Sequence, residues 1–135
     1  MNDQNHTFDT IIIGAGPAGL TAAIYSSWLG LDTVVLEAGV AGGKAFEAPK
    51  IENFPGFEEG TKGSELTEKM RKQAERFGAK IMETEEVVGL DLNGEIKRVT
   101  TRKRTYRGRV VIVATGTQKR KLRVPRRDRI SRQGS

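Results

Sequence analysis

The feature that most constrains the fold is a glycine-rich segment, GAGPAG at residues 14–19, between an apolar run and an amphipathic stretch. The run Phe8–Ile13 is rich in β-branched residues and predicts a buried strand. Pro17 stands where a first helical turn begins, and Gly30 stands where that helix would end. A second apolar run, Thr33–Leu36, predicts another strand. Residues 8–37 therefore predict a strand–helix–strand unit with parallel strands.

The spacing of the glycines has a specific physical meaning in such a unit. Gly14 permits a tight turn, Gly16 lets the backbone approach a pyrophosphate, and Gly19 lets the helix and the strand pack closely. The helix N-terminus then offers free N–H groups and the positive end of the helix dipole to an anion. We interpret the segment as a dinucleotide site, against the alternative of a glycine-rich turn without a ligand.

Glu37 ends the second strand, 23 residues after Gly14, which is close to the spacing of a ribose-binding acid. A carboxylate there accepts hydrogen bonds from both ribose hydroxyls and repels a 2′-phosphate, which disfavours NADP at this site. The alternative is an exposed acid at the end of a strand. The glycine segment and Glu37 do not by themselves separate FAD from NAD.

The middle of the chain predicts a long loop and then a second helix. Residues 38–62 are rich in Gly, Pro and charge and show no period, so we expect a functional or disordered loop. Ser64 is the expected N-cap of the next helix, and Leu66, Met70 and Phe77 are expected to face the core. Tyr25 and Trp28, near the end of the first helix, are interpreted as packing residues.

Short strands follow the second helix. Asn93-Gly94 separates two strand-like runs, which is a strong hairpin signal. A third antiparallel strand is expected at Thr105–Arg107, and the apolar run Val110–Ala114 is expected to return to the parallel sheet. The predicted fold class is therefore α/β. It is a Rossmann-like βαβ parallel sheet with helices on its faces, plus a small antiparallel β-meander of the strands Val87–Leu92, Glu95–Val99 and Thr105–Arg107.

The net charge of +6 is concentrated at one end of the chain. Thr117–Ser135 holds eight Lys or Arg and one acid, for a net +7, and residues 1–116 hold 15 basic and 16 acidic groups, for a net −1. A nucleic-acid interaction would therefore depend on the tail alone, and a solvated basic tail is the interpretation that we prefer.

The chain has no cysteine, which excludes a disulfide framework and any Cys-based metal or redox site. No stretch resembles a signal peptide or a membrane span, so we expect a soluble cytoplasmic protein. No catalytic acid, base or nucleophile and no metal site stands out. His6, the single histidine, lies in residues 1–7, which we expect to be a flexible N-terminus.

Three segments in order resemble the thioredoxin reductases and related flavoproteins of the pyridine nucleotide-disulfide oxidoreductase family. They are GAGPAGLTAAIY at residues 14–25, GGK at 42–44 followed by IENFPG at 51–56, and ATGT at 114–117. The resemblance covers roughly residues 8–125. The second and third segments favour FAD over NAD.

This resemblance implies an FAD-binding domain over residues 8–117. It implies a pyrophosphate contact by Gly14, Gly16, Pro17, Ala18 and Gly19, and a ribose contact by Glu37. It places Val87 beside the adenine, Thr115 and Gly116 near the phosphates, and Gly43, Lys44 and Asn53 near the flavin. The family usually has Gln where Lys44 stands, so Lys44 either faces the flavin and favours its anionic reduced form, or points to water.

The resemblance also indicates an incomplete FAD domain. Family members continue with a pyridine-nucleotide domain and, in true thioredoxin reductases, a Cys-x-x-Cys pair, and neither is present. Without cysteine, dithiol–disulfide exchange is chemically impossible for this chain. We therefore expect an FAD-binding module that is not a complete enzyme alone.

The basic tail, residues 118–135, departs from the family pattern after Pro125. Relatives continue there with Gly-Glu, an acidic and aromatic stretch, and Gly-Arg-Gly-Val. One reverse translation of the tail, read one base later, gives Gly-Glu-Thr-Glu-Phe-Leu-Gly-Arg-Gly-Val. We therefore expect a truncated reductase with a frameshifted tail, which the nucleotide sequence of the gene would test.

Truncation of such a domain would expose apolar surface and a strand edge. We therefore expect a homo-oligomer, or a partner chain that supplies the missing domain. An FAD-binding subunit of a split oxidoreductase and a nucleic-acid-binding protein acting through its tail are the alternative functions.

Overall fold

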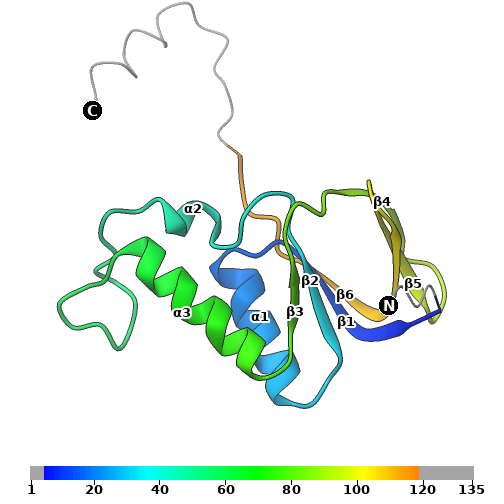
Figure 1. Cartoon of the computed structure of the whole chain (residues 1–135), viewed down its shortest axis with the longest axis horizontal. Helices are drawn as coiled ribbons and strands as arrows, with labels where there is room; N and C mark the ends of the chain where they lie inside the picture. Colours follow the sequence, from blue (N-terminus) through cyan, green and yellow to red (C-terminus); the bar gives the residue numbers. More distant parts are fainter. Residues whose placement is uncertain (1–4, 119–135) are drawn as a thin grey trace, which may run out of the picture.

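The computed structural model describes residues 5–118, and these form one six-stranded sheet with two long helices on one side (Figure 1). The sheet order is β3-β2-β1-β6-β5-β4. The elements are β1 (Thr7–Ile13), α1 (Pro17–Trp28), β2 (Thr33–Leu36), α2 (Gly43–Phe46), α3 (Gly63–Arg76), β3 (Lys80–Met82), β4 (Val87–Asp91), β5 (Lys97–Thr101) and β6 (Thr105–Val113).

The first half of the sheet is parallel, as the strand–helix–strand pattern predicted. β1 lies between β2 and β6 and pairs in parallel with both, and β3 adds in parallel to β2. All four residues of β2 are buried, which is typical of a parallel strand covered on both faces. The carboxyl ends of β1, β2 and β6 therefore meet at one edge of the sheet.

The second half of the sheet is an antiparallel meander of β4, β5 and the first part of β6. Both halves contribute to one apolar cluster, which contains Phe8, Ile11, Ile13, Val34, Leu36, Val99 and Tyr106. Met82 of β3 and Val87 of β4 pack against this same cluster, although their strands lie at opposite edges of the sheet. The sheet must therefore curl so that its two edges approach one another.

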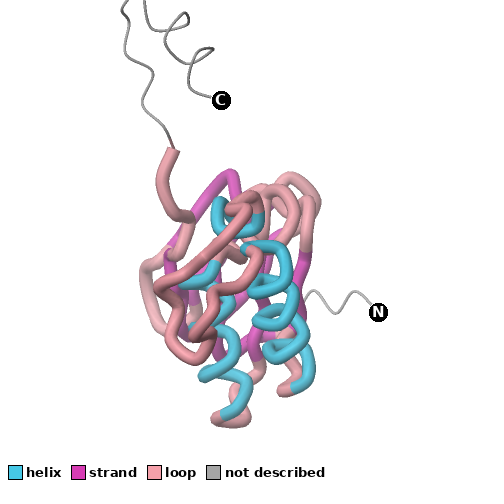
Figure 2. Tube along the Cα trace, turned by 90° about the vertical axis from the view of Figure 1, so that its left-hand side faces the viewer, coloured by secondary structure: helices cyan, strands magenta, loops and turns pink. Residues whose placement is uncertain are grey.

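The helices α1 and α3 cover the other face of the parallel strands (Figure 2). Leu20 of α1 packs with Leu66 and Met70 of α3 against Ile12 and Val35 of the sheet. The predicted core positions Leu66 and Met70 are confirmed as buried, whereas Phe77 is half-buried at the end of α3.

The loop predicted at residues 38–62 contains two ordered features. The short helix α2 occupies Gly43–Phe46, and Ile51 forms an isolated antiparallel bridge with Thr61. The prediction of Ser64 as N-cap was wrong, because α3 begins at Gly63 with Lys62 in the N-cap position. Gly63 can pack closely there: a Cβ at this position would lie 1.7 Å from the Ala45 carbonyl oxygen.

A hairpin around Asn93-Gly94 is confirmed, with a positive φ at Gly94, but its turn is longer than the two residues predicted: β4 ends at Asp91, β5 begins at Lys97, and Asp91 lies opposite Arg98. The two strands predicted at Thr105–Arg107 and Val110–Ala114 are one strand, β6. Its first residues pair with β5, and residues from Arg107 onward pair with β1. One strand therefore serves both halves of the sheet.

Beyond Gly108, β6 has a free edge on the side away from β1 within residues 5–118, because its pairing with β5 ends at Lys97–Gly108. Val110 and Val113 on this segment are 51% and 61% exposed. The expected strand edge and apolar surface are therefore present in the described part of the chain.

The folded part of the chain begins before residue 8, the first residue after the predicted flexible N-terminus, because β1 starts at Thr7. His6 Nε2 lies 2.6 Å from Asp32 Oδ2, and its ring contacts Phe8 edge-on with centroids 4.5 Å apart. The expectations for the basic tail fall on residues 118–135, of which all but residue 118 lie outside the described residues.

Candidate functional site

The glycine-rich segment forms a tight turn at the carboxyl end of β1. Gly14 has φ +107°, and its N–H donates to the Leu36 carbonyl oxygen at 2.8 Å. On the other side, Ala114 N–H donates to the Ile13 carbonyl at 2.8 Å, and a Cβ on Gly14 would lie 2.2 Å from the Ala114 carbonyl oxygen. Position 14 therefore requires glycine for both its φ and its space.

The first turn of α1 presents an uncompensated positive helix end. Gly16 is the N-cap and makes no side-chain capping bond, Pro17 follows it, and the first turn contains no acidic residue. The N–H groups of Ala18 and Gly19 lie in this turn, where an α-helix supplies them with no internal partner. A Cβ on Gly19 would lie 1.8 Å from the Gly14 carbonyl oxygen, so the helix start sits directly on the turn. The arrangement is suited to an anion.

Glu37 is half-buried and tied to the same turn by its carboxylate. Its Oε2 accepts from the Ala15 N–H at 2.8 Å, and its Oε1 accepts from the Gly39 N–H at 3.0 Å. Each carboxylate oxygen has a second lone pair. Glu37 can therefore fix the turn and still accept hydrogen bonds from ribose hydroxyls.

The segment before β4 packs beside Glu37. Glu85 N–H donates to the Glu37 carbonyl at 2.8 Å, and Thr84 N–H donates to the Gly39 carbonyl at 3.0 Å. Val87 follows two residues later. It is half-buried, and its side chain packs against the apolar cluster that contains Phe8 and Ile11. The structure therefore brings Val87 to the Glu37 side of the site.

The other side of the turn is covered by the start of α2. Gly42 N–H donates to the Ala15 carbonyl at 2.7 Å. Gly43 has φ +60°, and a Cβ there would lie 2.9 Å from the Gly16 Cα. A Cβ on Gly16 would meet only the Gly43 Cα, at 3.8 Å, so the backbone at Gly16 is open to a ligand.

Lys44 connects α2 to the end of β6. Its Nζ donates to Thr117 Oγ1 at 2.8 Å, across 73 residues of sequence. Thr115 and Gly116 precede Thr117 as exposed residues that follow β6, and Gly116 has φ +75°. The GGK and ATGT segments, far apart in sequence, thus meet at the carboxyl edge of the sheet.

Asn53 is exposed in the turn 52–58, and no hydrogen bond in the described residues links it to Gly43, Lys44 or Thr117. The remaining predicted site residues gather around the carboxyl ends of β1, β2 and β6. Open α/β sheets bind dinucleotides at this edge, where strand order reverses on either side of the first strand. The glycine cradle, the free helix end and the Glu37 carboxylate fit the pyrophosphate and ribose of FAD.

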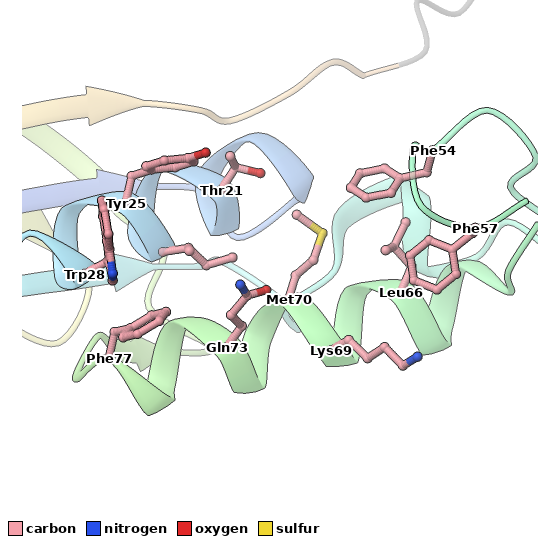
Figure 3. A pocket seen from close by; sticks show the side chains of 11 residues that line it. Thr21, Tyr25, Trp28, Phe54, Phe57, Leu66, Lys69, Met70, Gln73 and Phe77 are labelled. Atoms are coloured by element: carbon pink, nitrogen blue, oxygen red, sulfur yellow. The ribbon is translucent and has the colours of Figure 1, made fainter.

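An apolar groove between α1 and α3 was not predicted from the sequence (Figure 3). It encloses about 540 Å³. Tyr25 and Trp28, interpreted as packing residues, are instead 61% and 62% exposed on its α1 side. Phe54, Phe57 and Met70 also line it. Their residue types are those of core side chains, so the sequence alone did not separate them from buried residues.

No group of three or more His, Asp or Glu side chains within residues 5–118 could hold a metal ion. None of the helices in this part of the chain combines the length and apolarity needed to cross a bilayer.

Comparison with known proteins identifies relatives along most of the chain. The family described as pyridine nucleotide-disulphide oxidoreductase matches residues 8–133. A thioredoxin reductase of Streptomyces coelicolor is 49% identical over 128 residues, covering 93% of this chain and 39% of the relative.

Solved structures of thioredoxin reductases also match most of this chain. Lactococcus lactis thioredoxin reductase in its FR conformation superposes with a TM-score of 0.84 at 36% identity, over 93% of this chain and 41% of that one. A ferredoxin-flavin thioredoxin reductase from Clostridium acetobutylicum gives 0.75 at 29% identity, over 87% of this chain and 40% of that one.

The chain spans about two fifths of the length of these relatives. The matched portion carries the glycine turn, Glu37 and the two segments that meet at Lys44 and Thr117. The family is one of FAD flavoproteins, in agreement with the cofactor that the segments implied. The chain belongs to the pyridine nucleotide-disulphide oxidoreductase family, as a thioredoxin reductase-like FAD-domain sequence.

Proposed function

We propose that this chain is the FAD-binding module of a thioredoxin reductase-like oxidoreductase. The observation that carries the proposal is the convergence, at one edge of the sheet, of the glycine turn, the uncapped α1 end and the Glu37 carboxylate. The pyrophosphate is held at Gly14, Gly16 and Ala18, and the adenosine ribose at Glu37. Bound FAD would supply hydride and electron transfer, and the chain orients it.

The full reductase reaction needs groups from outside this sequence. The chain contains no cysteine, so it cannot itself exchange a dithiol for a disulfide. Its one glycine-rich dinucleotide turn is assigned to FAD, so the electron donor binds elsewhere. The module therefore acts in concert with a nicotinamide domain and an acceptor, and a separately encoded chain carrying them is the second candidate.

An absorbance spectrum of the purified chain, before and after addition of FAD and desalting, tests the proposal. We expect flavin bands that persist through desalting in the wild-type chain and are lost in G14V, whose Cβ would collide with the Ala114 carbonyl. A wild-type chain that is folded by circular dichroism but retains no flavin at micromolar concentration would contradict the proposal.

A further inference from the structure

Lys44 is a cation whose position is fixed by the fold. The helix that carries it, α2, is packed on two glycines. Gly43 approaches Gly16, and Gly63 N–H donates to the Ala48 carbonyl at 2.9 Å just after α2. Gly63 also leaves room for the Ala45 carbonyl, as described above. The backbone at Lys44 is therefore held between α1 and α3, and only its side chain is free to choose a direction.

The side chain of Lys44 points to the end of β6, where Thr117 accepts its hydrogen bond. Thr117 is a neutral partner, and none of the ion pairs found in residues 5–118 includes Lys44. Lysine is an ammonium at neutral pH. The 2.8 Å contact therefore localises a positive charge without neutralising it.

The sheet order decides which half of the cofactor meets this charge. β2 and β6 lie on opposite sides of β1. When the pyrophosphate of a dinucleotide lies at the α1 N-terminus, one half of the dinucleotide extends over the end of β2 and the other half extends over the end of β6. Because Glu37 ends β2 and takes the adenosine ribose, the flavin half lies on the β6 side, with Lys44 and Thr117.

We propose that the positive charge of Lys44, held at the flavin end by Thr117, makes this chain bind reduced FAD more tightly than oxidised FAD. This inference rests on the proposed function. The physical reason is charge: two-electron reduction leaves the flavin anionic at neutral pH, whereas the oxidised ring is neutral. A fixed cation nearby favours the reduced form.

The test uses the full chain loaded with FAD and measures the midpoint potential of the bound flavin by dithionite titration against an indicator dye. We expect K44M and K44Q to lower the ratio of reduced-form to oxidised-form affinity roughly tenfold, which is about 30 mV for a two-electron couple. K44R keeps the charge and should retain the wild-type potential. K72Q removes a lysine from the exposed face of α3 and serves as the matched control.

Thr117→Val tests the tether separately. It leaves the charge of Lys44 but removes its hydrogen-bond acceptor, so the potential should fall by part of the K44M shift. Raising the salt concentration should shrink the difference in midpoint potential between wild type and K44M. The reason is that Lys44 lies in an exposed position, where dissolved ions screen its charge.

The outcomes separate this inference from the proposed function. A wild-type chain that binds no FAD contradicts the proposed function itself. If wild type and K44M both bind FAD with the same potential, the proposed function stands and the role of Lys44 is overturned. K44M binding oxidised FAD more than tenfold worse than wild type also overturns it, since the charge should act on the reduced form.

Discussion

At the scale of single residues, Glu37 links the candidate site to the glycine turn. Its carboxylate accepts from two backbone N–H groups that lie on either side of it in sequence, at Ala15 and Gly39. A carboxylate held in this way would already be oriented before a ribose bound to it. Such preorganisation lowers the entropy that binding must otherwise overcome.

We predict that E37Q lowers FAD affinity roughly tenfold to a hundredfold, because charge-assisted hydrogen bonds contribute about 1.5–3 kcal/mol. The Gln amide also turns one acceptor into a donor that faces a backbone N–H. Fluorescence titration with FAD measures the change. E47Q, which neutralises an exposed acid at the end of α2, is the control. Equal affinity in E37Q and wild type would contradict the ribose role.

Tyr106 lies in the cluster between the two halves of the sheet, and its hydroxyl has no hydrogen-bond partner in the described residues. Burial, and then the negative charge of Glu85, raise the pKa of the Tyr106 phenol above its ordinary value of 10.0. The folded state therefore holds this proton more tightly than the unfolded state does.

Stability from the Tyr106 proton is complete below pH 10 and is lost as the pH rises through the raised pKa of the folded state. We predict that Y106F removes this loss, so its urea midpoint should fall less than that of wild type above pH 10. Y25F, which alters an exposed phenol, serves as the control. Parallel pH profiles for Y106F and wild type would be evidence against this linkage.

At the scale of elements, β6 combines two pairing environments in one strand. Its start belongs to the antiparallel meander and its end to the parallel sheet, where one edge is free within the described residues. A free edge with exposed valines is a template for another strand. Self-association through this edge is the arrangement that we propose for the isolated chain.

We predict that V110K shifts the chain toward monomer, because a lysine on an edge strand disfavours strand addition. Sedimentation velocity over a concentration series measures the shift. V40K places the same charge at an exposed loop valine and should leave association unchanged. If V110K associates as strongly as wild type, a different surface mediates the contact.

The sequence carried enough information for the elements whose pattern is local. The glycine spacing predicted the turn and the α1 start, and Asn93-Gly94 predicted the hairpin, because each requires a particular backbone conformation. The short helix α2 was not predictable, since it begins at two successive glycines, Gly42 and Gly43, and its position depends on contacts with Gly16 and Gly63. The sequence also did not predict that β6 is one continuous strand, because a glycine such as Gly108 inside a strand usually indicates an interruption.

Among the side chains of the candidate site, some positions followed from the local sequence and others depended on distant residues. The position of Glu37 was predictable because it follows from the strand end and the glycine spacing, and its role as a ribose ligand stays a prediction. The direction of Lys44 could not be predicted, because it depends on Thr117, 73 residues away in sequence. Tyr25 and Trp28 are residue types common in protein cores, but both are exposed, and their exposure depends on tertiary packing that the sequence pattern does not show.

At the scale of the whole molecule, cofactor binding and folding should be coupled. The candidate site draws on the turn after β1, the ends of β2 and β6, and α2, so a cofactor bound there would connect segments from Gly14 to Thr117. A ligand that binds only the folded state stabilises it by mass action.

We predict that FAD at 100 times its Kd raises the free energy of unfolding by about 2.7 kcal/mol, which is visible as a higher Tm by differential scanning fluorimetry. FMN should give a much smaller rise, because it lacks the adenosine half that Glu37 and the α1 end would hold. Equal stabilisation by FMN and FAD would show that the glycine turn does not bind a dinucleotide.

Trp28 is the single tryptophan of the chain and is the last residue of α1, whereas the glycine turn lies at the first residue of the helix. A helix of this length separates the two by about 17 Å. Its fluorescence is therefore a built-in optical reporter with two distinguishable responses. Covering of the groove should shift the emission to shorter wavelength, and a flavin at the far end of α1 should quench it by energy transfer. One cuvette can thus follow occupation of the groove and cofactor loading at the same time.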